Sequence, residues 1–118
     1  MILNHINLVV SDVQAARGFL MKHFGLDPQG MPGNDRIAFL RDEQGMILTL
    51  TNIDGATEVR YAGAFHIGFG QASPEKVDEI NRRLKEDGYD VPAPSKQHGS
   101  WTFYFEAPGG FVIEVLGA

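Results

Sequence analysis

Apolar and polar residues alternate along the chain in a pattern that predicts strands and helices in two similar halves. In the first half, residues 2–10 are rich in β-branched side chains and predict a strand. Apolar residues at helical spacing then predict a helix over residues 12–24, with Ser11 as its cap and Gly25 at its end. The further strands expected in this half span residues 36–41 and 46–52.

The same order of elements is predicted again in the second half. Residues 65–70 predict a strand, and Ser73 followed by Pro74 is typical of the start of a helix. Gly88 is expected to end that helix. The last predicted strands span residues 101–106 and 111–116, and residues 53–64 have the composition of a linker.

Superposing the two halves places His5 on His66 and Gly25 on Gly88. Recurrence of the elements and of their glycine turns in the same register indicates a duplicated module rather than a solenoid of short repeats. The sequence therefore predicts a single α+β domain over residues 1–118. Its first module spans about residues 1–53, its linker about 54–63 and its second module about 64–118.

Composition narrows the possible functions. The absence of cysteine excludes disulfides, thiolate metal sites and a cysteine nucleophile. A net charge of −5 without a basic run argues against a nucleic-acid surface. No charged leader precedes an apolar run and no apolar stretch is long enough to cross a bilayer, so we expect no membrane association and a cytoplasmic location.

Four polar residues, His5, Asn7, His66 and Glu114, lie in predicted strands that are otherwise mostly apolar. His5 and Asn7 share one face of the first predicted strand, and Glu114 is flanked by apolar residues in the last one. A buried carboxylate requires a cation, a proton or hydrogen-bond donors. A strand histidine taken singly is usually a core or rim residue, but His5, His66 and Glu114 together also suit a divalent metal such as manganese, iron or zinc. From this chemistry alone both interpretations stay open.

The chain resembles the vicinal-oxygen-chelate superfamily, which includes glyoxalase I, extradiol dioxygenases, fosfomycin-resistance enzymes and bleomycin-binding proteins. The residues that carry the resemblance are His-Ile-Asn-Leu-Val-Val-Ser-Asp at 5–12, His-Ile-Gly-Phe at 66–69 and Phe-Tyr-Phe-Glu-Ala-Pro-Gly-Gly-Phe-Val-Ile-Glu at 103–114. The resemblance implies two βαβββ modules that form a cupped, partly open mixed sheet with helices outside. It also implies that His5, His66 and Glu114 are metal ligands and that the protein is a homodimer.

The fourth ligand position of the superfamily falls on Thr49, where glyoxalase I would carry a glutamate. Threonine is a poor ligand and no general base at neutral pH. The resemblance therefore implies a metal-dependent dioxygenase, lyase or transferase acting on a small oxygen-bearing substrate, closer to extradiol dioxygenases or fosfomycin-resistance transferases than to glyoxalase I. The alternative is a metal-free protein that binds and sequesters a small molecule such as an antibiotic.

By the same resemblance, Tyr104 is expected to contact the substrate as a catalytic residue. This role requires Tyr104 to share a sheet face with Glu114, so we predict an odd-length or bulged turn, with residues 107–109 as the loop. The weaker candidates for substrate binding each have a structural alternative. They are Asn7, Thr49, Trp101, which could instead cover the core, and His98, which could instead be a surface loop residue.

Overall fold

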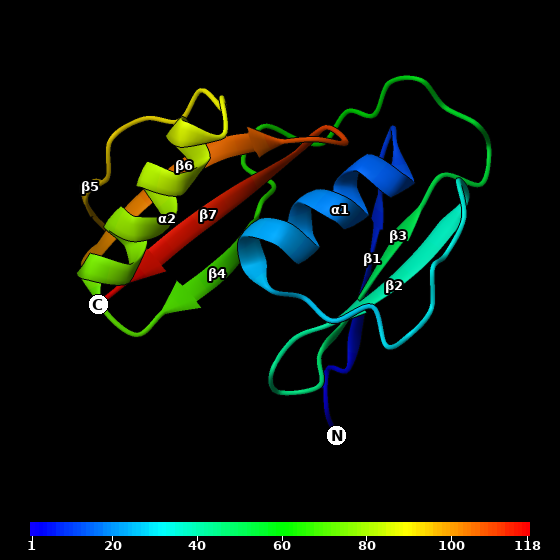
Figure 1. The fold of residues 1–118 in the computed structure, drawn as a ribbon, viewed down its shortest axis with the longest axis horizontal. Coiled ribbons are helices and arrows are strands. Elements are labelled where there is room, and N and C mark those ends of the chain that lie inside the picture. Colours follow the sequence, from blue (N-terminus) through cyan, green and yellow to red (C-terminus); the bar gives the residue numbers. More distant parts are fainter. The chain divides into compact units, whose positions relative to one another are not determined.

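The computed structural model describes all residues from 1 to 118 and divides into two compact units. The first unit comprises Met1–Tyr61 together with Ala107–Phe111, and the second comprises Ala62–Glu106 together with Val112–Ala118. The boundary after Tyr61 lies inside the expected linker. Each unit has its own sheet and its own helix (Figure 1).

The first unit contains a three-stranded sheet in the order β1-β3-β2. Its elements are β1 (His5–Val9), α1 (Val13–Phe24), β2 (Ile37–Arg41) and β3 (Ile47–Thr51). β1 runs parallel to β3, and β2 runs antiparallel to it. The fourth strand of this module is reduced to a single bridge, in which Asp27 and Arg41 exchange backbone hydrogen bonds of 2.9 Å in both directions.

The two faces of this sheet differ because side chains alternate along each strand. Leu8, Leu40 and Leu50 are fully or almost fully buried and belong to the face that packs against α1. Burial of each such side chain contributes about 1.5–3 kcal/mol to folding. His5 and Asn7 lie on the opposite face of β1 and are exposed.

The ends of α1 follow local capping chemistry, with one correction to the sequence prediction. Asp12, and not Ser11, is the N-cap: its side chain accepts a 2.9 Å hydrogen bond from the Ala15 amide. Both residue types cap well, but the helix begins at Val13, so only Asp12 is in the right place. Gly25 ends the helix in the left-handed conformation, as predicted.

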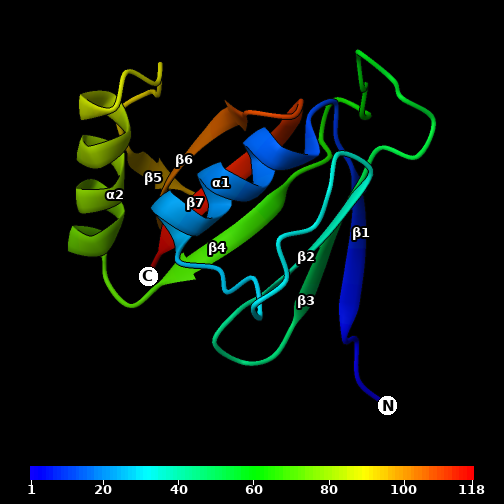
Figure 2. The ribbon, with the colours of Figure 1, turned by 45° about the vertical axis from the view of Figure 1, so that its right-hand side comes forward.

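The second unit contains a four-stranded sheet in the order β4-β7-β6-β5, with β4 parallel to β7. Figures 1 and 2 both show α2 alongside this sheet. The helix begins after the cap Ser73, with Pro74 in its first turn, as predicted. The elements are β4 (Ile67–Gln71), α2 (Pro74–Glu86), β5 (Ser95–Gln97), β6 (Ser100–Ala107) and β7 (Phe111–Gly117).

Three turn residues, Pro108, Gly109 and Gly110, separate β6 from β7. Gly109 has a φ of 105° and its carbonyl accepts a 3.0 Å hydrogen bond from the Ser11 amide. A Cβ on Gly109 would lie 3.1 Å from the Cβ of Val10 and 3.3 Å from that of Ala16. Glycine is therefore required here both by its backbone conformation and by close packing.

This architecture confirms the predicted fold class, α+β with two βαβββ-like modules and mixed sheets. Neither helix is long and apolar enough to cross a membrane.

Candidate functional site

The Glu114 carboxylate is the centre of a polar group in the second unit. Glu114 lies on β7 beside Gly68 of β4, and its side chain is only 12% exposed. The fully buried Thr102 donates a 2.8 Å hydrogen bond from its hydroxyl to Oε2 of Glu114. β6 therefore supplies one of the donors that a largely buried carboxylate needs.

Tyr104 lies on the same face as Glu114, as predicted from the turn. The turn is three residues long, although it comprises Pro108 to Gly110 and is shifted by one residue from the predicted loop. The Tyr104 hydroxyl hydrogen-bonds Glu114, and this bond is the main reason why the pKa of Tyr104 is raised; burial and the carboxylate charge add to it. The phenol is therefore held in its protonated, donating form.

His66 stands just before β4 and directs one ring nitrogen at Glu114. With the proton on Nδ1, the ring donates a 2.9 Å hydrogen bond to the Ala64 carbonyl. Nε2 then has a free lone pair and lies 3.4 Å from Oε1 of Glu114, while the ring meets that of Tyr104 edge-on, with centroids 5.2 Å apart. Two acceptors that face each other at this distance need a proton or a cation between them.

His5 has the same ring chemistry in the first unit. Its Nδ1 lies 2.7 Å from the side-chain oxygen of Asn4, and the side chain is exposed on the face of β1 opposite the core. A proton on Nδ1 again leaves Nε2 free. Metal-binding histidines usually donate their other ring N–H to an oxygen acceptor in this way.

The donor set fits a divalent metal. Nitrogen and oxygen ligands about 2.1 Å from a tetrahedral metal lie about 3.4 Å from each other, which matches the 3.4 Å between His66 Nε2 and Glu114 Oε1. Imidazole and carboxylate are also ligands that manganese, iron and zinc accept. Within either unit no group of three His, Asp or Glu side chains converges on one point.

Asn7 and Thr49 are neighbours in the first unit, since β1 and β3 pair them. The Asn7 amide donates a 3.1 Å hydrogen bond to the Thr51 hydroxyl, so it connects the two strands. Thr49 is 8% exposed and belongs to the face of His5 and Asn7. The sheet thus groups three predicted site residues of the first module on one face.

Trp101 and His98 are not brought to Glu114. The Trp101 ring N–H donates a 2.7 Å hydrogen bond to Asp78 of α2, so this side chain is on the helix face of the sheet. His98 is exposed in the turn between β5 and β6, with a φ of 51°. These placements agree with the structural alternatives for both residues, core cover and surface loop.

Thr102 and the Ala64 carbonyl were missed by sequence reasoning. The signal for Thr102 was present, because it precedes Tyr104 by two residues in a strand and must share its face. Ala64 contributes a backbone atom, which no side-chain pattern predicts.

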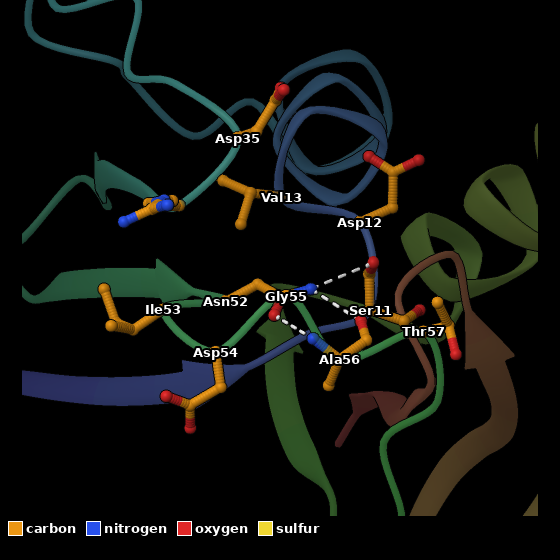
Figure 3. Close-up of a pocket in the computed structure, with 11 residues that line it drawn as sticks. Ser11, Asp12, Val13, Asp35, Asn52, Ile53, Asp54, Gly55, Ala56 and Thr57 are labelled. Atoms are coloured by element: carbon orange, nitrogen blue, oxygen red, sulfur yellow. Dashed lines mark hydrogen bonds between the residues drawn. The ribbon is translucent and has the colours of Figure 1, made fainter.

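The first unit also contains a pocket of about 500 Å³ at the N-terminus of α1. Asn52 organises its wall, donating from its side-chain amide to the carbonyls of Ser11 and Ala56 (Figure 3). The carboxylates of Asp12, Asp35 and Asp54 line the pocket but point in different directions. They do not converge on a metal site.

Comparison with known proteins identifies the family. Residues 2–115 match the model of the Glyoxalase/Bleomycin resistance protein/Dioxygenase superfamily. The structure of a possible glyoxalase from Bacillus cereus is similar at a TM-score of 0.87 and 52% identity over 98% of both chains. A lactoylglutathione lyase from Agrobacterium tumefaciens shares the fold at a TM-score of 0.78 and 20% identity, over 99% of this chain and 93% of the other.

A glyoxalase/dioxygenase from Nostoc punctiforme also shares the fold, at a TM-score of 0.75 and 24% identity over 98% of this chain and 90% of the other. No curated protein matches the sequence. The family match extends over nearly the whole chain, and the 52% identity to the Bacillus cereus protein is shared over almost the full length of both chains. The chain belongs to the Glyoxalase/Bleomycin resistance protein/Dioxygenase superfamily.

Proposed function

We propose that the protein is a metal-dependent enzyme that acts on a small oxygen-bearing substrate, with His5, His66 and Glu114 as the ligands of a divalent metal. The observation that carries this proposal is the pair of acceptors formed by His66 Nε2 and Glu114 Oε1 at 3.4 Å. In the neutral ring each atom presents a lone pair to the other, so a proton or a shared cation must lie between them, and we propose that the cation is a divalent metal. A bound metal would act as a Lewis acid that polarises an oxygen of the substrate.

The surrounding residues fix the two ligands. The Ala64 carbonyl can accept the Nδ1 proton of His66, and in the neutral ring this tautomer leaves the lone pair of Nε2 facing Glu114. Thr102 holds Oε2 of Glu114 and leaves Oε1 free to bind. Tyr104 keeps its proton beside Glu114. Its single O–H can turn from Glu114 to donate to a substrate oxygen that carries negative charge.

Thr49 sets the reaction class that we propose. A hydroxyl at this position cannot take up a proton from carbon at neutral pH as a glutamate could. Dioxygenase-like or transferase-like chemistry, in which a substrate docks on the metal through oxygen, therefore suits the site better than the glyoxalase I reaction. An assay for the glyoxalase I reaction tests this proposal directly, and we expect no activity.

His5 belongs to the first unit, whereas His66 and Glu114 belong to the second. We propose that the protein is a homodimer and that His5 completes the ligand set, from the same chain or from the second copy. This supplies the third protein ligand and leaves coordination positions for the substrate.

The experiment is a measurement of bound metal in protein purified without chelators. We expect about one divalent ion per chain in the wild type, none in the His5→Ala/His66→Ala double variant, and wild-type content in His98→Ala, which removes an exposed histidine of the β5–β6 turn. Equal metal content in all three proteins would show that the ligands are wrong. Wild-type protein that neither carries nor takes up manganese, iron or zinc would support the metal-free binding function instead.

A further inference from the structure

The side chain of Asn4 holds the ring of His5. Its amide oxygen lies 2.7 Å from His5 Nδ1, at the short end of the range for N–H···O hydrogen bonds. An amide oxygen can only accept, so in the neutral ring this bond places the proton on Nδ1. Nε2 then carries the free lone pair that a metal requires.

The backbone of Asn4 is anchored, although the residue precedes β1. Its carbonyl accepts a 2.9 Å hydrogen bond from the amide of Ile47, the β3 residue that pairs with His5. Neighbouring side chains in a strand point to opposite faces, so strand geometry alone does not bring the Asn4 amide to the ring. The bond to His5 is the one hydrogen bond of the Asn4 side chain, which connects it to His5 and to no other part of the fold.

The two proposed histidine ligands have acceptors of the same kind behind them. The acceptor at Nδ1 of His66 is the Ala64 carbonyl at 2.9 Å, and that of His5 is the Asn4 amide. Both are uncharged amide oxygens, whereas a carboxylate in this position would make the imidazole a more basic ligand. The acceptor of His66 is a backbone atom, so only that of His5 can be removed by substitution.

Resting on the proposed metal site, we propose that Asn4 is a positioning residue that keeps His5 in the Nδ1-protonated form, in which Nε2 is ready to bind the divalent metal. Without the amide oxygen the tautomer of this exposed ring is no longer fixed, and metal binding then has to move a proton off Nε2 in part of the molecules. Groups that hold the second ring N–H of a ligand typically contribute about 10–100-fold to metal affinity. Because Asn4 and His5 are both exposed, we expect about 10-fold, the lower end of this range.

The first measurement needs no metal. Long-range proton–nitrogen correlation spectra of the nitrogen-labelled full-length protein, recorded at a pH at which imidazole is neutral, distinguish a protonated from an unprotonated ring nitrogen. The His5 signals are assigned by their loss in His5→Gln. Wild-type His5 should have a protonated Nδ1, Asn4→Ala should shift toward a protonated Nε2, and Asn4→Asp should keep the wild-type form. A protonated Nε2 in the wild type, or the same tautomer in wild type and Asn4→Ala, overturns the proposal.

The second measurement is the affinity for zinc, determined by competition with a chromophoric chelator. Asn4→Ala should bind zinc about 10-fold more weakly than the wild type, and Asn4→Asp, which keeps the acceptor and adds a charge, at least as tightly. Gln44 provides the matched controls, because it is exposed in the turn between β2 and β3 and does not bond His5. Gln44→Ala removes an amide and Gln44→Glu adds a charge, and both should bind zinc like the wild type.

These results separate the role of Asn4 from the function on which it rests. Wild type that does not bind zinc overturns the proposed function, and the role of Asn4 with it. Equal zinc affinity of wild type and Asn4→Ala overturns the positioning role alone. A loss in Asn4→Ala that Asn4→Asp does not restore also overturns it, since the acceptor is then not the cause. Metal-free Asn4→Ala should melt at the wild-type temperature, so a fall in its affinity cannot be ascribed to unfolding.

Discussion

Replacing Thr102 with valine removes the hydroxyl that holds Glu114 and leaves the shape of the side chain unchanged. The lost bond is 2.8 Å long, its donor is fully buried and its acceptor is a carboxylate. Hydrogen bonds to charged groups contribute about 1.5–3 kcal/mol. We expect the free energy of unfolding of the metal-free protein to fall by about 2 kcal/mol, which corresponds to roughly 8 °C in melting temperature for a domain of this size.

The same substitution should weaken metal binding. Groups that orient a ligand typically contribute about 10–100-fold to metal affinity, and we expect a loss in this range for Thr102→Val. Denaturant unfolding and calorimetric zinc titration measure the two effects separately. Thr51→Val is the control, because Thr51 is also an almost buried strand threonine but does not bond Glu114 and is not a candidate site residue. Wild-type zinc affinity in a destabilised Thr102→Val protein would refute the positioning role.

Four further predictions follow from other parts of the molecule. Tyr61→Phe should destabilise the protein by about 1–2 kcal/mol in chemical unfolding, because the Tyr61 hydroxyl donates to the Val9 carbonyl at 2.7 Å and accepts from its amide at 2.9 Å. Burial raises the pKa of Tyr61 above 10, its value in the unfolded chain. The stabilisation by the Tyr61 hydroxyl should therefore be complete below pH 10 and should be lost as the pH rises through the pKa of the folded protein. A stability difference between wild type and Tyr61→Phe that persists above that pKa would contradict these hydrogen bonds. Gly109→Ala should destabilise by about 1–3 kcal/mol, since it combines a φ of 105° with contacts of 3.1 and 3.3 Å, and an unchanged melting temperature would contradict this packing. Turnover of the methylglyoxal–thiol adduct should be negligible with any divalent metal, because Thr49 supplies no base, and robust turnover would show that another base exists. Light scattering should give a homodimer at micromolar concentration, whereas a monomer that binds one metal would show that a single chain completes the site.

The parts of the fold that the sequence predicted are those with strong local signals. Gly25 marks the end of α1 because few other residues tolerate its left-handed backbone, and the Ser73-Pro74 pair marks the start of α2 because it supplies a capping hydroxyl and a fixed helical φ. β5 was missed because Ser95–Gln97 is short, polar and exposed, without the alternation that marks a half-buried strand. The predicted N-cap of α1, Ser11, was wrong by one residue because Ser11 and Asp12 have similar capping preferences.

The candidate site was only partly predictable. Alternation along β6 and the odd turn length were sufficient to place Tyr104 beside Glu114, because strand geometry determines the face of each residue. The tautomer of His66 depends on the Ala64 carbonyl, a backbone atom whose position follows from tertiary structure. For Trp101 the sequence left open a pocket residue or a residue that covers the core, because its partner Asp78 comes from a helix distant in sequence.

The central claim, that His66 and Glu114 hold a divalent metal, is tested most directly by the thermal stability of wild type and Glu114→Ala with increasing manganese, iron(II) or zinc. A ligand that binds only the folded state adds about 2.7 kcal/mol of stability when present at about 100 times its dissociation constant. The wild type should therefore melt at a markedly higher temperature in saturating metal, and Glu114→Ala should show no shift. Identical responses of the two proteins to all three ions would contradict the metal site.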